Sequence, residues 1–137
     1  MKDIENRNSR IDFVIEHTDV INKKYGLLFL EVDEHQHESY PVPCEISRMT
    51  KVIESLRTEG NELPIRFIRY NPHSFSVNNV KQRIHQNDRH SQLIEHIKTC
   101  TFDTDFSVKY LFYDEYDDKP AIFFASEYNE HFKQFVI

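Results

Sequence analysis

The chain has 137 residues, of which 39% are hydrophobic and 29% charged, and its formal net charge is −6. This length and composition are typical of one folded domain, and the acidic charge argues against a protein that coats nucleic acid through clustered lysine and arginine. No apolar run approaches the roughly 18 residues that a membrane span requires. We therefore expect a single domain over residues 1–137, with no membrane-spanning segment.

Residues 1–6 lack the apolar core of a signal peptide, and the two cysteines, Cys44 and Cys100, provide no disulfide framework. An intracellular location, in the cytoplasm or the nucleus, is therefore expected. The sequence contains only two glycines and has no glycine-rich loop, which excludes P-loop and dinucleotide-binding functions.

The first predicted elements are two strands. Residues 10–17 show enough alternation of side chains to predict a strand. Residues 27–34 begin with four consecutive apolar residues and predict a second strand that is buried on both faces. The turn between them lies either at Asn22 and Lys23 or close to Gly26. The two strands are expected to form an antiparallel hairpin.

Acidic residues are expected to meet at the end of this hairpin. Glu31 and Asp33 point to the same face of their strand, because side chains alternate between faces. With the turn centred on Asn22 and Lys23, Asp12 lies opposite Asp33 and diagonal to Glu31, at about 5 and 7 Å. Ionised acids at the end of a buried strand need compensation, which a divalent cation usually provides. Carboxylate ligands predict Mg²⁺ or Mn²⁺. The alternative is that these acids are solvent-facing strand ends.

Two helices and a third strand are predicted next. Apolar residues recur with helical spacing from Ile46 onward, which predicts an amphipathic helix ending near Gly60. Residues 64–70 predict a strand, and a strand–helix–strand order places it parallel to the preceding strand. A second helix is predicted at about residues 88–99. Its core-facing residues are expected to be Leu93, Ile94 and Ile97.

The last predicted elements are a C-terminal hairpin, with strands at residues 106–113 and 121–126, and a short apolar tail at residues 132–137. The predicted fold class is therefore α/β, or α+β. It has a mixed β-sheet that contains an antiparallel hairpin and a βαβ crossover, with flanking helices and an extra C-terminal β-hairpin.

This layout resembles the core of the PD-(D/E)xK, or restriction-endonuclease-like, nucleases. The resemblance is to the Vsr-like branch of that superfamily. It is carried by Asp12-Phe13, Glu31-Val32-Asp33 with His37, Arg48 on the next helix and Arg69-x-Asn71. When Gln36 and Glu45 are added to these residues, the pattern is similar to that of uncharacterised domains of giant viruses, algae and oomycetes. Those domains often follow cysteine-rich repeats in their own chains. The likeness spans about residues 10–93. This likeness implies two further possibilities: that the chain is virus-encoded, and that it is the C-terminal part of a larger protein.

The resemblance implies a metal-dependent endonuclease that hydrolyses phosphodiester bonds, with DNA as the expected substrate. Asp12 and Glu31 would be metal ligands, and Asp33 a third ligand or a water-orienting group. Asp33 occupies the position where the family has a lysine. His37 would act as general base or acid, with metal binding and phosphate contact as alternatives. A homodimer is also expected, because many nucleases of this fold pair to cut both strands.

Six further residues are expected to support the site or bind phosphate: Gln36, Glu45, Arg48, Lys51, Arg69 and Asn71. Glu45 and Arg48 lie three apart on one helical face and could pair with each other, or Arg48 could steady the acids or bind phosphate. Lys51 is a candidate to replace the missing lysine. Arg69 is expected to brace Glu31 or to contact DNA.

The second hypothesis is a non-catalytic module on the same fold that binds nucleic acid or a protein partner. The acidic net charge and Asp33 favour this hypothesis. The acids at positions 12 and 31, together with His37, favour the nuclease.

Overall fold

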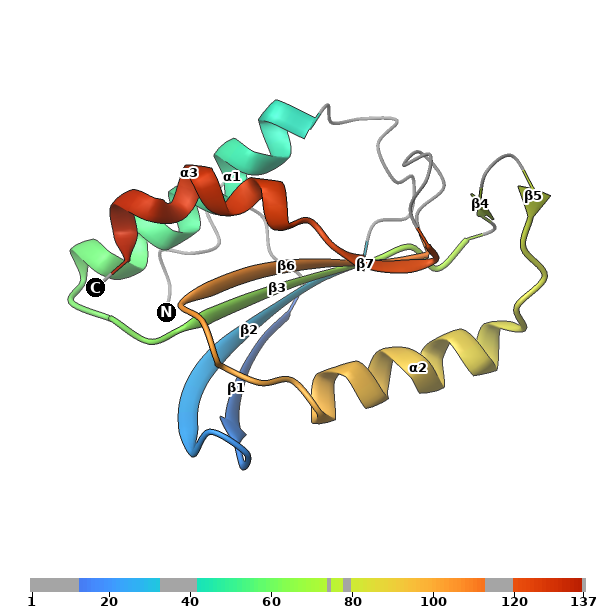
Figure 1. Ribbon diagram of the computed structural model, residues 1–137, viewed down its shortest axis with the longest axis horizontal. Helices are drawn as coiled ribbons and strands as arrows, with labels where there is room; N and C mark the ends of the chain where they lie inside the picture. The colour runs from blue at the N-terminus through green and yellow to red at the C-terminus, as the bar shows by residue number, and fades with distance from the viewer. Residues whose placement is uncertain (1–12, 33–41, 74, 78–79, 113–119, 137) are drawn as a thin grey trace.

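A computed structural model describes residues 13–32, 42–73, 75–77, 80–112 and 120–136 (Figure 1). In this part of the chain, five strands form one mixed sheet in the order β1-β2-β3-β6-β7. The strands are β1 (Phe13–Asp19), β2 (Lys24–Val32), β3 (Ile65–Tyr70), β6 (Phe106–Leu111) and β7 (Ile122–Phe124). β1 is antiparallel to β2, β3 is parallel to both β2 and β6, and β7 is antiparallel to β6. The predicted α+β class is confirmed.

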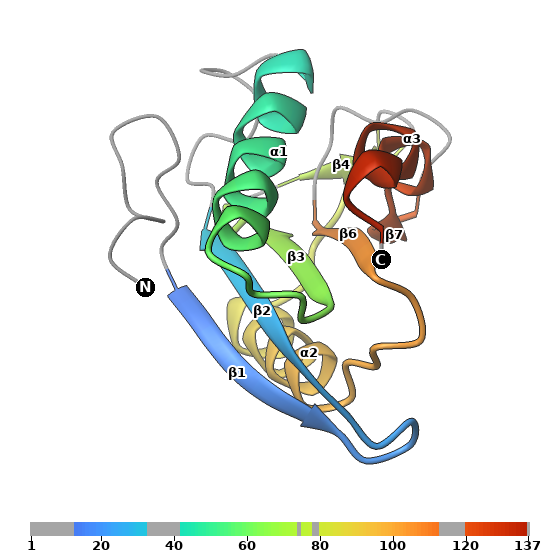
Figure 2. The ribbon, with the colours of Figure 1, turned by 90° about the vertical axis from the view of Figure 1, so that its left-hand side faces the viewer.

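Helices cover both faces of the sheet. One face carries α1 (Val42–Thr58) and the short α3 (Asn129–Phe132), and the other carries α2 (Gln86–Lys98) (Figures 1 and 2). Turns of 3₁₀ helix at Ser126–Tyr128 and Lys133–Phe135 flank α3, so part of the predicted apolar tail is helical. A small ribbon of β4 (Ser76–Val77) and β5 (Val80–Lys81) precedes α2. Its strands were not predicted, because two residues are too few to show an alternating pattern.

The hydrophobic core is divided by the sheet into two clusters. Leu27 and Phe29 pack in the cluster on the α1 face, whereas Leu28 and Leu30 pack in the cluster on the α2 face. All four are buried, which confirms the prediction of a strand covered on both faces. The helical spacing predicted for α1 is also confirmed. Its buried residues are Met49, Val52, Ile53 and Leu56.

One predicted core position of α2 is wrong. Ile94 is 50% exposed, whereas Leu93 is buried and Ile97 packs against the core. The buried stripe of this helix continues one turn upstream of Leu93 to Arg89, which is also buried. Because a charged side chain at that position carries no apolar signal, the pattern extended the predicted core face to Ile94 and missed Arg89.

The turn between β1 and β2 is organised by Asp19. It comprises residues 20–23. One carboxylate oxygen of Asp19 accepts hydrogen bonds from the backbone nitrogens of Ile21 and Asn22, at 2.9 and 3.2 Å. Lys23 completes the turn with a φ of 55°. Aspartate commonly caps turns in this way.

This turn gives the hairpin a register two residues away from the predicted one. Phe13 pairs with Leu30, whereas a turn centred on Asn22 and Lys23 would pair it with Val32. The prediction that Asp12 lies opposite Asp33 depended on a turn centred on Asn22 and Lys23. The observed register shows that this premise is wrong. Asp12 and Asp33 themselves lie outside the described residues.

Asp19 also ties the hairpin to the loop before β6. Its second carboxylate oxygen accepts from the backbone nitrogen of Phe102 at 2.8 Å and from the side-chain amide of Asn22 at 2.7 Å. Burial acts to raise the pKa of this carboxyl, but the hydrogen bonds from Phe102, Asn22 and Ile21 outweigh it and lower the pKa from 3.8 to about 2.

Acid is therefore expected to remove the stability that Asp19 provides. The folded-state pKa lies below the unfolded value, so the contribution is complete above the unfolded pKa of 3.8 and is lost as the pH falls towards 2. Urea midpoints measured across this window should fall less steeply with decreasing pH in Asp19→Asn than in the unchanged chain. Equal slopes would contradict the role of the ionised carboxylate.

Gly26 is a strand residue of β2, so the alternative of a turn close to it is wrong. A Cβ added at this position would lie 2.6 Å from ring carbons of Phe102. Gly26→Ala is therefore expected to cost about 1–3 kcal/mol through overpacking, measured by urea unfolding. Phe102→Leu in the Gly26→Ala background should recover part of this loss. Strictly additive effects of the two substitutions would contradict the proposed clash.

Candidate functional site

All of the predicted site residues that the structure describes, except Lys51, lie near the ends of β2 and β3. Glu31 lies directly beside Arg69 in the parallel register of the two strands. Leu27 and Phe29 pack on the α1 face, and Glu31 faces the same way because side chains alternate. The carboxyl ends of these strands therefore present polar groups to α1.

Five side chains form a connected polar group, here called the Glu31–Arg69 cluster. Arg69 donates from one nitrogen to Glu31 and from another to Glu45, the latter at 3.2 Å. Arg48 donates to the other oxygen of Glu31 at 3.0 Å. The Tyr110 hydroxyl donates to the second oxygen of Glu45 at 2.7 Å. Three strands of the sheet, β2, β3 and β6, are thereby joined to α1 through two acids, two bases and a tyrosine hydroxyl.

The Glu31–Arg69 cluster is buried. Exposed fractions are 1% for Arg69, 0% for Glu45 and 7% for Glu31. The Arg69 guanidinium also lies 5.9 Å from the ring centroid of Tyr110, and the Tyr110 hydroxyl lies 3.1 Å from that of Tyr128. Charges taken out of water to this extent are stable only when they are paired and hydrogen-bonded. The balanced pairing of this cluster meets that requirement.

The partners differ from one of the sequence predictions. Arg69 braces Glu31, which was one of its two predicted roles. Arg48 steadies the Glu31 carboxylate, and Glu45 binds Arg69, so the described contacts join α1 to the sheet. The predicted pairing within α1 considered only neighbours along the helix, whereas the contacts described for Glu45 and Arg48 are with strand residues.

Asn71 and Lys51 have other environments. Asn71 is fully buried just after β3, where its amide donates to the Phe112 carbonyl at 2.8 Å and its oxygen accepts from the His73 nitrogen at 3.0 Å. These contacts hold the loop after β3 against the end of β6. Lys51 is exposed and lines a separate hollow between α1 and His131. The structure therefore does not support Lys51 as the replacement for the family's lysine.

Two residues near this edge were not predicted. Tyr110 completes the pairing of Glu45, and Arg89 of α2 donates to the carbonyls of Asn71, Pro72 and His73, which follow β3. The only signal for Arg89 was an arginine one helical turn before Leu93. Tyr110 gave no signal, because a tyrosine in an apolar strand resembles an ordinary core residue.

The predicted metal ligands are only partly visible. Asp12, Asp33, Gln36 and His37 lie outside the described residues. Among the residues that are described, no group of three or more acidic, histidine or cysteine side chains could hold a metal ion. Glu31 supplies one carboxylate, and its two oxygens accept from Arg48 and Arg69.

Comparison of the chain with protein-family models, with curated proteins and with solved structures finds no match. No helix in the described part of the chain combines the length and apolar character needed to cross a membrane. The Glu31–Arg69 cluster is therefore the basis on which a function can be inferred.

Proposed function

We propose that the chain is a metal-dependent nuclease domain that hydrolyses phosphodiester bonds, with DNA as its expected substrate. The position of Glu31 carries the proposal, because this buried acid lies near the carboxyl end of β2, beside a parallel strand and below α1. Ligands of open α/β sheets bind outside the carboxyl ends of strands. The β2–α1–β3 connection also supports the finer proposal of a restriction-endonuclease-like core of the Vsr-like branch.

In this proposal, Glu31 would hold Mg²⁺ or Mn²⁺ together with Asp12 and Asp33. The described residues fit such an ion only in part, because Glu31 is the only one of the three proposed ligands among them, whereas the ion would need several oxygen ligands. When bound, the ion would lower the pKa of a water and stabilise the leaving oxygen. Arg48 and Arg69 fix the orientation of the Glu31 carboxylate from two sides.

Arg48 is the member of the cluster best placed to meet a phosphate. Its side chain is 16% exposed, compared with 1% for Arg69. A guanidinium can bind a phosphate through two parallel hydrogen bonds. We therefore assign Arg48 to the substrate side of the site and Arg69 to its support.

Nicking of supercoiled plasmid DNA tests this proposal. The purified chain should convert supercoiled to open-circular DNA with Mn²⁺ or Mg²⁺, and a chelator should stop the reaction. Single-stranded DNA, RNA and a branched junction serve as further substrates. Failure to cleave every one of these with either ion would contradict the nuclease assignment.

The second candidate is a non-catalytic module that binds nucleic acid or a protein partner. The specific observation in its favour is that the two oxygens of Glu31 already accept from two arginines, which offset the negative charge that a cation would use. This candidate predicts binding that a chelator does not change and no heat of Mn²⁺ binding in calorimetry.

A further inference from the structure

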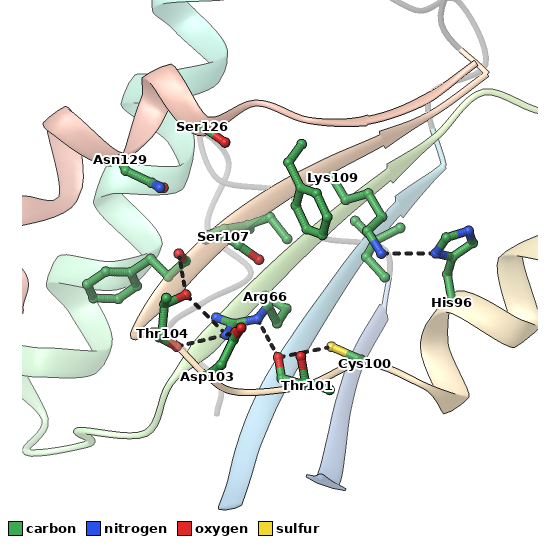
Figure 3. A pocket seen from close by; sticks show the side chains of 14 residues that line it. Arg66, His96, Cys100, Thr101, Asp103, Thr104, Ser107, Lys109, Ser126 and Asn129 are labelled. Carbon is green, nitrogen blue, oxygen red and sulfur yellow. Dashed lines mark hydrogen bonds and ion pairs between the residues drawn. The ribbon is translucent and has the colours of Figure 1, made fainter. Parts of the chain in front are cut away.

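A cavity of about 260 Å³ lies over β3 and β6, bordered by β7 and by the C-terminal part of α2 (Figure 3). None of the residues of the Glu31–Arg69 cluster lines it. The cavity combines two cationic side chains, Arg66 and Lys109, and the carboxylate of Asp103 with hydroxyl groups and an aromatic wall. Its principal lining residues are Arg66, His96, Ser107, Lys109, Phe124 and Asn129.

Lys109 brings an ammonium group to one side of this cavity. Its nitrogen lies 2.9 Å from Nδ1 of His96 (Figure 3). The same nitrogen lies 4.6 Å from the centroid of the Phe124 ring. Within the described residues, no carboxylate lies within ion-pair distance of Lys109. Burial lowers the pKa of Lys109 and also that of His96, where the Lys109 charge adds to the effect. The neutral imidazole accepts one of the three ammonium hydrogens, so the others can serve a ligand.

Arg66 adds a second, fixed positive charge. Its guanidinium is buried and donates to the carbonyls of Thr101 and Thr104, each at 2.8 Å. It also pairs at 3.2 Å with Asp103, whose side chain is 68% exposed and therefore offsets the charge only weakly. Two cationic side chains against the one carboxylate of Asp103 leave the lining with a net positive charge, in a chain whose net charge is −6.

The remaining lining favours an organic molecule over a bare ion. Ser107 and Asn129 add polar groups, whereas Phe124 and Ile68 add apolar surface. A volume of about 260 Å³ lies just below the range of roughly 300–1,000 Å³ that is typical for drug-sized ligands. A single ring bearing one anionic group is of suitable size.

We propose that this cavity binds a small organic anion, a carboxylate or a phosphate monoester, with its anionic group at Lys109 and its apolar body against Phe124. The Lys109 ammonium provides the direct contact, and Arg66 provides the long-range attraction. The proposal does not depend on the nuclease assignment, because it involves neither the metal nor the nucleic acid.

Titration of the whole chain with benzoate, phenyl phosphate and inorganic phosphate tests the proposal, with binding followed by calorimetry and by the NMR signal of the Lys109 side chain. At least one of the two organic probes should bind with a Kd in the millimolar range or below, and Lys109→Met should weaken it at least about tenfold. Lys98→Met is the matched control. Lys98 is an exposed lysine at the C-terminal end of α2, near the cavity, but it does not line the cavity. This control should bind as the unchanged chain does.

Lys109→Met is expected to fold, because it removes a partly buried charge without leaving a described acid unpaired. Phe124→Ala provides a second variant, since Phe124 is 54% exposed and its loss should be tolerated. It should weaken phenyl phosphate and leave inorganic phosphate unchanged. Whichever of benzoate and phenyl phosphate binds more tightly shows whether the cavity prefers a carboxylate or a phosphate monoester. Absence of binding at about 20 mM of every probe, or equal binding to the unchanged chain and Lys109→Met, would overturn the proposal.

Discussion

Replacement of Arg69 by methionine is expected to lower the free energy of unfolding by about 3–5 kcal/mol. Arg69 is 1% exposed and donates to both Glu31 and Glu45. Its removal leaves Glu45 fully buried without its basic partner, while methionine retains much of the apolar volume of the arginine stem. Urea unfolding followed by circular dichroism measures the loss.

Two comparisons show whether the unpaired acids are the cause. Arg48→Met should cost less, about 1–3 kcal/mol, because Arg48 is more exposed and Glu31 keeps its contact with Arg69. Adding Glu31→Gln and Glu45→Gln to Arg69→Met should restore part of the lost stability, since no buried carboxylate is then left without Arg69. A loss below about 1 kcal/mol for Arg69→Met would contradict the importance of this pairing.

Glu31→Gln is expected to reduce Mn²⁺-dependent nicking by at least about 100-fold, if nicking is observed for the unchanged chain. Glutamine keeps the shape of the side chain and removes the charge that a metal ion requires. Initial nicking rates measure the effect. Glu54→Gln is the matched control, because it neutralises an exposed acid of α1 that lies outside the Glu31–Arg69 cluster.

The Glu31→Gln substitution also disturbs the contacts with Arg48 and Arg69, so its activity has to be separated from its stability. Rates should be measured well below the unfolding midpoint of the variant, alongside the affinity for Mn²⁺. Lower Mn²⁺ affinity in a folded variant supports a ligand role for Glu31. Unchanged nicking in the folded variant would contradict that role.

The sheet and α1 could be predicted because their signals are local. Four consecutive apolar residues predicted a strand buried on both faces, and the spacing of Met49, Val52, Ile53 and Leu56 predicted the buried face of α1. The features that could not be predicted depend on polar side chains acting at a distance. Asp19 sets the register of the hairpin through the turn, and the buried face of α2 includes Arg89 rather than Ile94.

In the candidate site, too, local features could be predicted and contacts between distant polar side chains could not. The position of Glu31 at a strand end and its bracing by Arg69 followed from the predicted parallel strands. The contact of Glu45 with Arg69 and Tyr110 could not be predicted, because it requires the distance between α1 and two strands that are far apart in sequence. The predicted roles of Asp12, Asp33, Gln36 and His37 remain predictions.

Arg89 has a consequence for how the molecule opens. Its guanidinium donates to the carbonyls of three successive residues after β3, at the edge where Asn71 also fixes the end of β6. Detaching α2 from the sheet would leave these carbonyls without their shared donor. The backbone carbonyls that lose these hydrogen bonds lie beside the candidate site. We therefore expect the first turns of α2 and the end of β3 to exchange their amide hydrogens as one cooperative unit.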